Sequence, residues 1–196
     1  MALPRRIVLA SASAYRRGLL ERLGLPFEWA APQVDESPVH GESTAETALR
    51  LAVLKARAIA PRYPDAIVIG SDQVASCDGV RVGKPGNHAN AVKQLELMSG
   101  RVALFETALA VLDAATGEVR SRLVPCRVTF RALTRATIET YLEREQPYDC
   151  AGSAKAEGLG IALIARIETD DPTSLIGLPL IALTELLAAA GVSVVG

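Results

Sequence analysis

The segment Ala66-Ile-Val-Ile-Gly-Ser-Asp-Gln73 decides the fold. Its first five residues are apolar or small and include a β-branched run, which is typical of a fully buried strand. Polar residues follow at once, so we expect Asp72 to lie at the carboxyl end of that strand. Open α/β sheets place their sites at such strand ends. An ordinary turn aspartate is the alternative interpretation.

Outward from this strand, strand-like and helix-like segments alternate along the chain. The patterns predict strands over 6–10, 27–31 and 158–165, and helices over 13–23, 43–60, 87–98, 134–144 and 179–190. Two long strand-like segments, Val102–Leu112 and Val119–Phe130, surround a turn at 115–117 and predict a hairpin. The alternation predicts an α/β fold, and the hairpin predicts a mixed sheet.

Composition excludes several classes of protein. The 196 residues suit one domain, or two small lobes that share a sheet. With 49% apolar and 22% charged residues, a disordered tail or a coiled coil is not expected. A net charge of −1 gives no bulk positive field to hold long nucleic acid. Three separated cysteines and two distant histidines predict neither a disulfide framework nor a zinc site.

The first residues imitate a signal peptide, with two arginines, an apolar patch and small residues. That patch, Ile7–Ala10, has only four residues, against roughly 7–15 in a signal peptide. The apolar C-terminal stretch is interrupted by Pro179 and Glu185. It therefore falls short of the roughly 18 apolar residues of a membrane span. We expect a cytoplasmic protein that does not enter a membrane.

The residues after the first predicted strand are the first candidate site. Ser11, Ser13, Tyr15, Arg16 and Arg17 crowd the start of a predicted helix. Cations there oppose the helix dipole, while the free N–H groups of the helix attract anions. A bound phosphate would reconcile the two tendencies. The alternative is a surface helix with a serine cap and solvated arginines.

Three weaker signals also carry charge. Gly83-Lys84-Pro85-Gly86 holds a cation in a stiff turn, although it lacks the P-loop pattern. Val34-Asp35-Glu36 places two acids in a polar loop, which usually means a solvated loop. Lys55 shares a predicted helix face with apolar residues. A lysine in that position usually extends to water, or it reaches a ligand at the sheet edge.

Together these pieces resemble the Maf-like nucleoside triphosphate pyrophosphatases. The resemblance begins with Ser11-x-Ser13-x-x-Arg16-x-x-Leu19-Leu20 and runs in register from about Arg6 to the end of the chain. The further pieces are Val34-Asp35-Glu36, Leu51-Ala52-x-x-Lys55-Ala56, Ser71-Asp72-Gln73-Val74 and Gly83-Lys84-Pro85. Each piece is short, but five in order make a specific match.

Within the family, the chain resembles the branch that acts on 7-methyl-GTP. The pieces that carry this are Ser71-Asp72-Gln73-Val74, the segment Cys150–Gly158, Asp171-Pro172, and Leu175-x-Gly177-Leu-Pro179-Leu. One position departs from the branch, which typically has Trp where this chain has Tyr15. Base stacking is therefore expected to be weaker or altered.

The resemblance implies hydrolysis of a nucleoside triphosphate between its α and β phosphates. Arg16, Lys55 and Lys84 would surround the triphosphate and stabilise charge on the leaving pyrophosphate. Mg²⁺ or Mn²⁺ would bridge phosphate oxygens to Glu36 and Asp72. Asp72 would accept the proton of the attacking water, and whether it acts as base, metal ligand or both stays open.

Base selection follows from hydrogen-bonding chemistry at three positions that the resemblance implies. Guanine offers two donors that one carboxylate accepts, which suits Glu157, with Gln73 and Tyr15 beside it. Methylation at N7 makes guanine cationic, which favours a carboxylate and an aromatic face. The alternative is that Glu157 is a solvated residue beside Lys155.

The implied fold is a Maf/ITPase-like α/β domain spanning residues 1–196, with a long twisted mixed sheet and two lobes around one catalytic cleft. The expected partner is a small nucleotide, and a homodimer stays open. Two other functions compete. One is a nucleotide-binding regulator of cell division with little turnover. The other is a UTP/dTTP pyrophosphatase of the other Maf branch, which Glu157 disfavours because pyrimidine carbonyls are acceptors.

Overall fold

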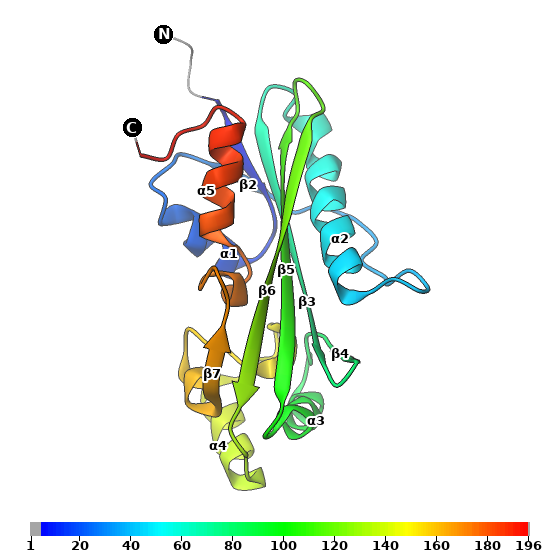
Figure 1. The fold of residues 1–196 in the computed structure, drawn as a ribbon, viewed down its shortest axis with the longest axis vertical. Coiled ribbons are helices and arrows are strands. Elements are labelled where there is room, and N and C mark those ends of the chain that lie inside the picture. The colour runs from blue at the N-terminus through cyan, green and yellow to red at the C-terminus, as the bar shows by residue number, and fades with distance from the viewer. Residues whose placement is uncertain (1–4, 196) are drawn as a thin grey trace. The chain divides into compact units, whose positions relative to one another are not determined.

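A computed structural model of the chain describes residues 5–195 and divides into two compact units (Figure 1). The first unit comprises the chain up to Asp72, then Thr107–Val124, and the chain from Asp171 on. The second comprises Gln73–Glu106 and Pro125–Asp170. Three long strands contribute residues to both units, because three of the unit boundaries fall within them.

The described residues form a seven-stranded sheet with the order β2-β1-β3-β5-β6-β7, and β4 pairs with β3. β1 is parallel to both β2 and β3, whereas β3–β4 and β6–β7 are antiparallel, so the predicted mixed sheet is confirmed. The strands are β1 (Ile7–Ala10), β2 (Glu28–Ala30), β3 (Ile67–Cys77), β4 (Val80–Val82), β5 (Val102–Asp113), β6 (Val119–Phe130) and β7 (Ile164–Glu168).

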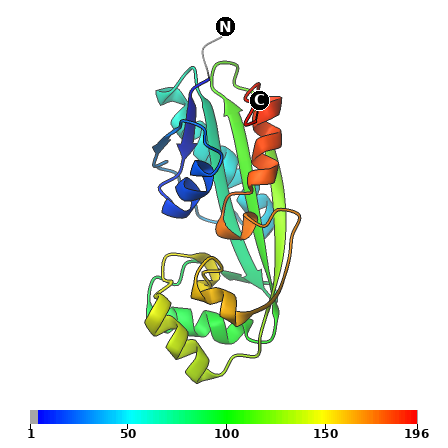
Figure 2. The same cartoon turned by 90° about the vertical axis from the view of Figure 1, so that its left-hand side faces the viewer.

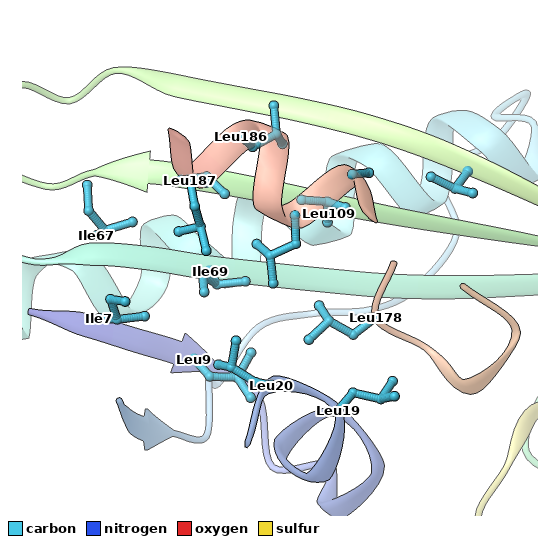
Figure 3. Packing of buried hydrophobic residues seen from close by; sticks show 14 residues of the cluster. Ile7, Leu9, Leu19, Leu20, Ile67, Ile69, Leu109, Leu178, Leu186 and Leu187 are labelled. Atoms are coloured by element: carbon cyan, nitrogen blue, oxygen red, sulfur yellow. The ribbon is translucent and has the colours of Figure 1, made fainter. Parts of the chain in front are cut away.

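In the first unit, helices cover both faces of the sheet (Figure 2). α1 (Ala14–Glu21) and α5 (Leu180–Ala189) lie on one face, and α2 (Thr44–Ile59) lies on the other. Figure 3 shows leucines of α1 and α5 packed against aliphatic residues of the strands. The α/β expectation of helices on both sides of a mixed sheet is therefore confirmed in this unit.

Local sequence explains where these helices begin. The Ser13 hydroxyl accepts a hydrogen bond from the Arg16 amide, so Ser13 is the N-cap of α1. Ser43 and Glu46 form the predicted capping box of α2, each side chain bonding the other residue's backbone. α5 has a distant cap, because the buried Asp171 carboxylate accepts hydrogen bonds from the Ile181 and Ala182 amides.

The second unit is built around α3 (His88–Met98) and α4 (Arg135–Glu145), with the short 3₁₀ helices η2 (Ala151–Ser153) and η3 (Leu159–Leu163). Asn87 and Thr134 cap the two α-helices, and both helices begin within a residue of the predicted positions. The remaining 3₁₀ helices, η1 (Ala60–Arg62) and η4 (Ser174–Ile176), belong to the first unit.

Two expected strand boundaries were wrong. β3 does not end at Gly70 but continues to Cys77, because its second half pairs with β4 around the Asp78-Gly79 turn. The last strand begins at Ile164 and not at Gly158, since residues 159–163 form a 3₁₀ helix. A side chain at Gly160 would lie 2.6 Å from the Lys155 backbone, so this turn packs too closely for any other residue.

Within the described part of the chain, no helix is both long and apolar enough to cross a membrane. The three cysteines are free. Burial raises the pKa of the Cys77 thiol, and it raises that of Cys150 to about 12, so both are protonated and unreactive near neutral pH.

Candidate active site

The junction between β1 and α1 positions the two serines that the sequence singled out. Ser11 is buried, and its hydroxyl accepts a hydrogen bond from the Ser13 amide at 3.1 Å. Ser13 in turn caps the helix. The first turn of α1 has no acidic residue, so nothing there offsets the positive end of the helix dipole. Tyr15 lies half-buried in this turn. Anion binding at the junction stays a prediction.

Arg16 is held by a residue far along the chain. Its Nε donates a hydrogen bond of 2.8 Å to the carbonyl oxygen of Gly177, and Ser71 Oγ lies 2.9 Å from the same oxygen. Burial lowers the pKa of Arg16, and the nearby carboxylates of Asp72 and Glu36 oppose that shift. An arginine pKa starts so far above neutral that the guanidinium keeps its charge.

Lys55 brings the two predicted acids together. It is 5% exposed, and its Nζ lies 2.6 Å from Asp72 Oδ1 and 2.8 Å from Glu36 Oε1. Of the two interpretations of a lysine on an apolar helix face, extension to water is therefore wrong here. Two carboxylates satisfy the ammonium where it is buried, as a charge removed from water requires.

A close contact between α2 and β3 sets this geometry. A Cβ atom at Gly70 would lie 2.1 Å from the Ala52 carbonyl oxygen and 2.9 Å from the Ala56 amide nitrogen. Only glycine lets the helix backbone approach the strand so closely. Lys55 stands between those two alanines on the helix, and Asp72 stands two residues after Gly70 on the same side of the strand.

Asp72 is not at the end of a strand, which corrects the sequence-based expectation. It lies in the middle of β3, with five further strand residues after it. The sequence did not show this continuation because Ser71, Asp72 and Gln73 are hydrophilic and interrupt the apolar run. Asp72 and Ser71 are nevertheless buried, because each has a partner: Lys55 for the carboxylate and backbone carbonyls for the hydroxyl.

The loop that carries Glu36 is exposed but anchored. The Glu36 side chain is 58% exposed, and the adjacent Ser37 carbonyl accepts a hydrogen bond of 3.2 Å from Arg50 Nη2. Arg50 also forms a bidentate ion pair with Glu42, at 2.6 and 2.8 Å. The hydrogen bond to Arg50 lowers the pKa of Glu42 to about 2, so this clamp persists at neutral pH.

The described residues contain no group of three or more histidines, cysteines or acids that could hold a metal by themselves. Glu36 and Asp72 are instead a pair, each with one oxygen on Lys55 Nζ. Mg²⁺ commonly binds through one or two carboxylates and completes its shell with water and substrate phosphates. The hard oxygen donors of this pair therefore fit an ion that arrives with a nucleotide.

The other predicted site residues belong to the second unit and are described within it. Gln73 follows Asp72 on β3 and is half-buried. Lys84 is exposed in the turn after β4. Glu157 is exposed between η2 and η3, and the neighbouring Lys155 pairs with Glu145 at 2.9 Å. The structure thus unites the cluster of Arg16, Lys55, Asp72 and Glu36 and leaves the roles of these three as predictions.

Sequence reasoning missed two residues that support the cluster. Gly177 supplies the carbonyl for Arg16 from a backbone with φ of 120°, which favours glycine, and a Cβ there would lie 3.5 Å from Arg16 Nε. Gly70 supplies the close helix contact described above. The only signal for Gly177 was its place in the motif before Leu178-Pro179, which did not indicate a contact with Arg16.

Sequence similarity to known proteins shows which family the chain belongs to. Residues 6–190 match the family described as Maf-like protein. A protein from Thiobacillus denitrificans named 7-methyl-GTP pyrophosphatase is 60% identical over 188 residues, covering 96% of this chain and 94% of the relative. One of the same name from Cupriavidus pinatubonensis is 58% identical, covering 95% and 94%.

A solved structure of a HAM1 protein from Coxiella burnetii is also similar, with a TM-score of 0.47 and 18% identity over 64% of this chain and 73% of that one. The family match takes in the serine–arginine motif after β1, the Lys55 helix, the Asp72 strand and the Gly177 turn. With that match over nearly its whole length, and with relatives well above half identical to it, the chain belongs to the Maf-like protein family.

Proposed function

We propose that the protein hydrolyses 7-methyl-GTP to the nucleoside monophosphate and pyrophosphate. The observation that carries the proposal is the identity of 58–60%, over nearly the whole chain, to relatives named 7-methyl-GTP pyrophosphatase. The cluster of two cations and two carboxylates in the first unit supports it. Cations can bind a triphosphate and stabilise its negative charge, and a carboxylate can accept a proton from the attacking water.

In this proposal, Asp72 is the proton acceptor. Water attacks the α phosphorus, the bond from that phosphorus to the α–β bridging oxygen breaks, and the water proton passes to Asp72. Lys55 Nζ holds Asp72 Oδ1 at 2.6 Å, which orients the carboxylate and leaves Oδ2 as the atom assigned to the proton. The leaving oxygen departs with the negative charge of pyrophosphate.

Cations stabilise that developing charge. The Gly177 carbonyl engages one edge of the Arg16 guanidinium through Nε, so the terminal amino groups are the part assigned to phosphate. Lys84 is assigned to the leaving phosphates. The hydroxyls of Ser11 and Ser13 and the N-terminus of α1 are assigned to the remaining phosphate oxygens.

A divalent ion, Mg²⁺ or Mn²⁺, would be held by Glu36 and Asp72 together with the phosphates. When bound, it would neutralise phosphate charge and favour the ionised form of the attacking water. The base is assigned to Glu157, Gln73 and Tyr15. The Glu157 carboxylate would accept from both guanine donors, and N7 methylation would add charge attraction and a cation–π contribution of about 0.5–2 kcal/mol at Tyr15.

The test is an assay of pyrophosphate release from 7-methyl-GTP, GTP, UTP and dTTP with Mg²⁺ or Mn²⁺. We expect the highest kcat/KM on 7-methyl-GTP. The D72N variant controls for contaminating phosphatases, because it keeps the shape of the side chain and loses its basicity. Preference for UTP or dTTP would assign the protein to the other Maf branch, and nucleotide binding without turnover would favour a regulator; either result overturns the proposal.

A further inference from the structure

The turn that carries Lys84 is fastened at both ends within the second unit. The Gly83 carbonyl oxygen accepts hydrogen bonds from Gln94 Nε2 at 3.0 Å and from the Gly152 amide at 3.2 Å. The Gly86 amide donates to the Tyr148 carbonyl at 3.0 Å. Because these hydrogen bonds hold the backbone that carries Lys84, less conformational entropy is lost when the exposed lysine binds an anion.

Gln94, on α3, connects this turn to a second loop. While its Nε2 donates to Gly83, its Oε1 accepts a hydrogen bond of 2.6 Å from Ser153 Oγ. Ser153 begins the segment that leads to Glu157, the residue assigned to base selection. A single amide group therefore touches both the turn that carries Lys84 and the loop that carries Glu157.

The loop is strained at the point that Gln94 contacts. Gly152 and Ser153 both have left-handed backbones, with φ of 69° and 54°, and Ser153 is fully buried. Left-handed serine costs free energy and persists only where its surroundings hold it. A Cβ at Gly152 would lie 3.1 Å from Phe105 Cζ, so a side chain at this position would also be crowded by that ring.

The far side of the loop is anchored separately. Glu145 pairs with Lys155 at 2.9 Å and accepts a hydrogen bond of 2.7 Å from the Leu159 amide. These contacts lower the pKa of Glu145, the bond from Leu159 contributing most. Glu157 thus stands between two fixed points, and the one nearer the N-terminus depends on Gln94.

We propose that Gln94 is a positioning residue that, alongside the direct bond from the Gly152 amide to Gly83, couples the Lys84 turn to the base-selecting loop, so that contact with the leaving phosphates and discrimination of the base both depend on its amide. The inference rests on the proposed function for the roles of Lys84 and Glu157. Its structural part, the dependence of the loop on Gln94, stands on the hydrogen bonds alone.

The helix itself offers a matched control. Asn90, one turn before Gln94, donates from Nδ2 to the Pro85 carbonyl at 3.0 Å and so holds the same turn by the same chemistry. Within the described part of the chain, Asn90 makes no hydrogen bond to the loop. N90A should therefore loosen the Lys84 turn only, whereas Q94A should loosen the turn and the loop together. S153A removes the loop side of the Gln94 contact and leaves its bond to Gly83.

The kinetic experiment measures kcat and KM on 7-methyl-GTP and GTP for the parent, N90A, Q94A and S153A. We expect Q94A and S153A to reduce the preference for 7-methyl-GTP by about three- to tenfold, the size of one hydrogen bond. N90A should change both nucleotides by the same factor. Combining Q94A with S153A should lower the preference little further than Q94A alone. Equal effects of Q94A on both nucleotides would overturn the coupling.

A second measurement separates this inference from the proposed function. Hydrogen exchange of the Ser153 amide, which donates to the Cys150 carbonyl at 3.3 Å within the loop, reports on the loop without any substrate. We expect faster exchange in Q94A than in the parent, and parental exchange in N90A. Unchanged exchange in Q94A would refute the coupling whatever the enzyme does. If Q94A exchanges faster than the parent but the parent hydrolyses neither nucleotide, the proposed function is overturned and the dependence of the loop on Gln94 stands.

Discussion

At the scale of the residue, the candidate site depends on one buried ammonium group. Lys55 holds Asp72 and Glu36 within 2.8 Å of a single nitrogen. Removing one partner of a buried ion pair usually costs several kcal/mol, because the remaining charge is left without compensation. Here the ammonium has two carboxylates, so loss of one charge leaves an ion pair in place. A single substitution of Asp72 or Glu36 should therefore leave the protein folded, so its effect on activity can be measured.

Asp72→Asn should preserve the fold and remove most turnover. The asparagine oxygen can still accept from Lys55, and Glu36 still balances its charge, but the amide is no base. We expect kcat to fall by at least about a hundredfold, the lower end of general-base contributions. Nucleotide binding, measured by calorimetry, should change far less. Turnover within about tenfold of the parent would remove Asp72 from the role of proton acceptor.

Glu157→Gln tests base selection at a single exposed side chain. The amide keeps the size of the glutamate but faces one guanine donor with its own NH₂ group. The 7-methyl-GTP preference should shrink by about 1–3 kcal/mol, or one to two decades in relative kcat/KM. The loss should be largest for 7-methyl-GTP, smaller for GTP, and least for UTP and dTTP. An unchanged order and unchanged ratios would show that Glu157 does not read the base.

At the scale of the element, the packing of α2 on β3 determines whether the cluster forms. Gly70→Ala would push the Ala52 carbonyl away, because the new Cβ would lie 2.1 Å from it. We expect a loss of about 1–3 kcal/mol or more in the free energy of unfolding, as for other overpacked contacts. Activity of the folded fraction should fall too, since a displaced α2 moves Lys55 away from Asp72.

Gly18→Ala is the matched control for that change. Gly18 lies within α1, and a Cβ there would meet nothing within 4 Å. Alanine should therefore stabilise this helix by about 0.5–1 kcal/mol through lower backbone entropy in the unfolded chain. Urea unfolding of both variants checks the pair. Equal stabilities for the two alanine variants would contradict the close approach of α2 to β3.

At the scale of the whole molecule, paired carboxylates predict how stability depends on pH. Hydrogen bonds from Arg50 lower the pKa of Glu42 from 4.5 to about 2, and a bond from Arg5 lowers that of Asp113. Groups whose pKa is lower in the folded state stabilise it fully above their unfolded pKa. That stabilisation is lost as the pH falls through the folded pKa.

The contribution of these groups to Tm should therefore be lost as the pH is lowered from about 4.5 to about 2. Above about pH 4.5 their contribution should stay nearly constant. Calorimetry across the range tests this. Glu42→Gln should lower Tm at neutral pH and make the acid decline less steep. A decline of the same steepness in this variant would show that the Arg50 clamp does not contribute.

Many secondary-structure elements could be predicted because the signals for them lie within a few residues. The Ser43–Glu46 capping box starts α2 where expected, and Ser13 caps α1. The β5–β6 turn at 115–117 also formed as predicted, with the Gly117 amide bonded to Asp113. Hydrophobic periodicity and capping act locally, so they can be read without knowing the rest of the chain.

The sequence by itself determined the α/β alternation, the local helix starts and, through five ordered motifs, the family. Tertiary structure alone decided that β3 runs on past Asp72, because β4 pairs with its last residues, 75–77, and the polar Ser71 and Asp72 before them are buried against partners from elsewhere in the chain. It also decided that Lys55 turns inward to two acids and that Arg16 rests on a carbonyl 161 residues away. Such contacts join residues whose separation along the chain carries no local signal. They form only when packing brings helix and strand backbones together, as it does at Gly70.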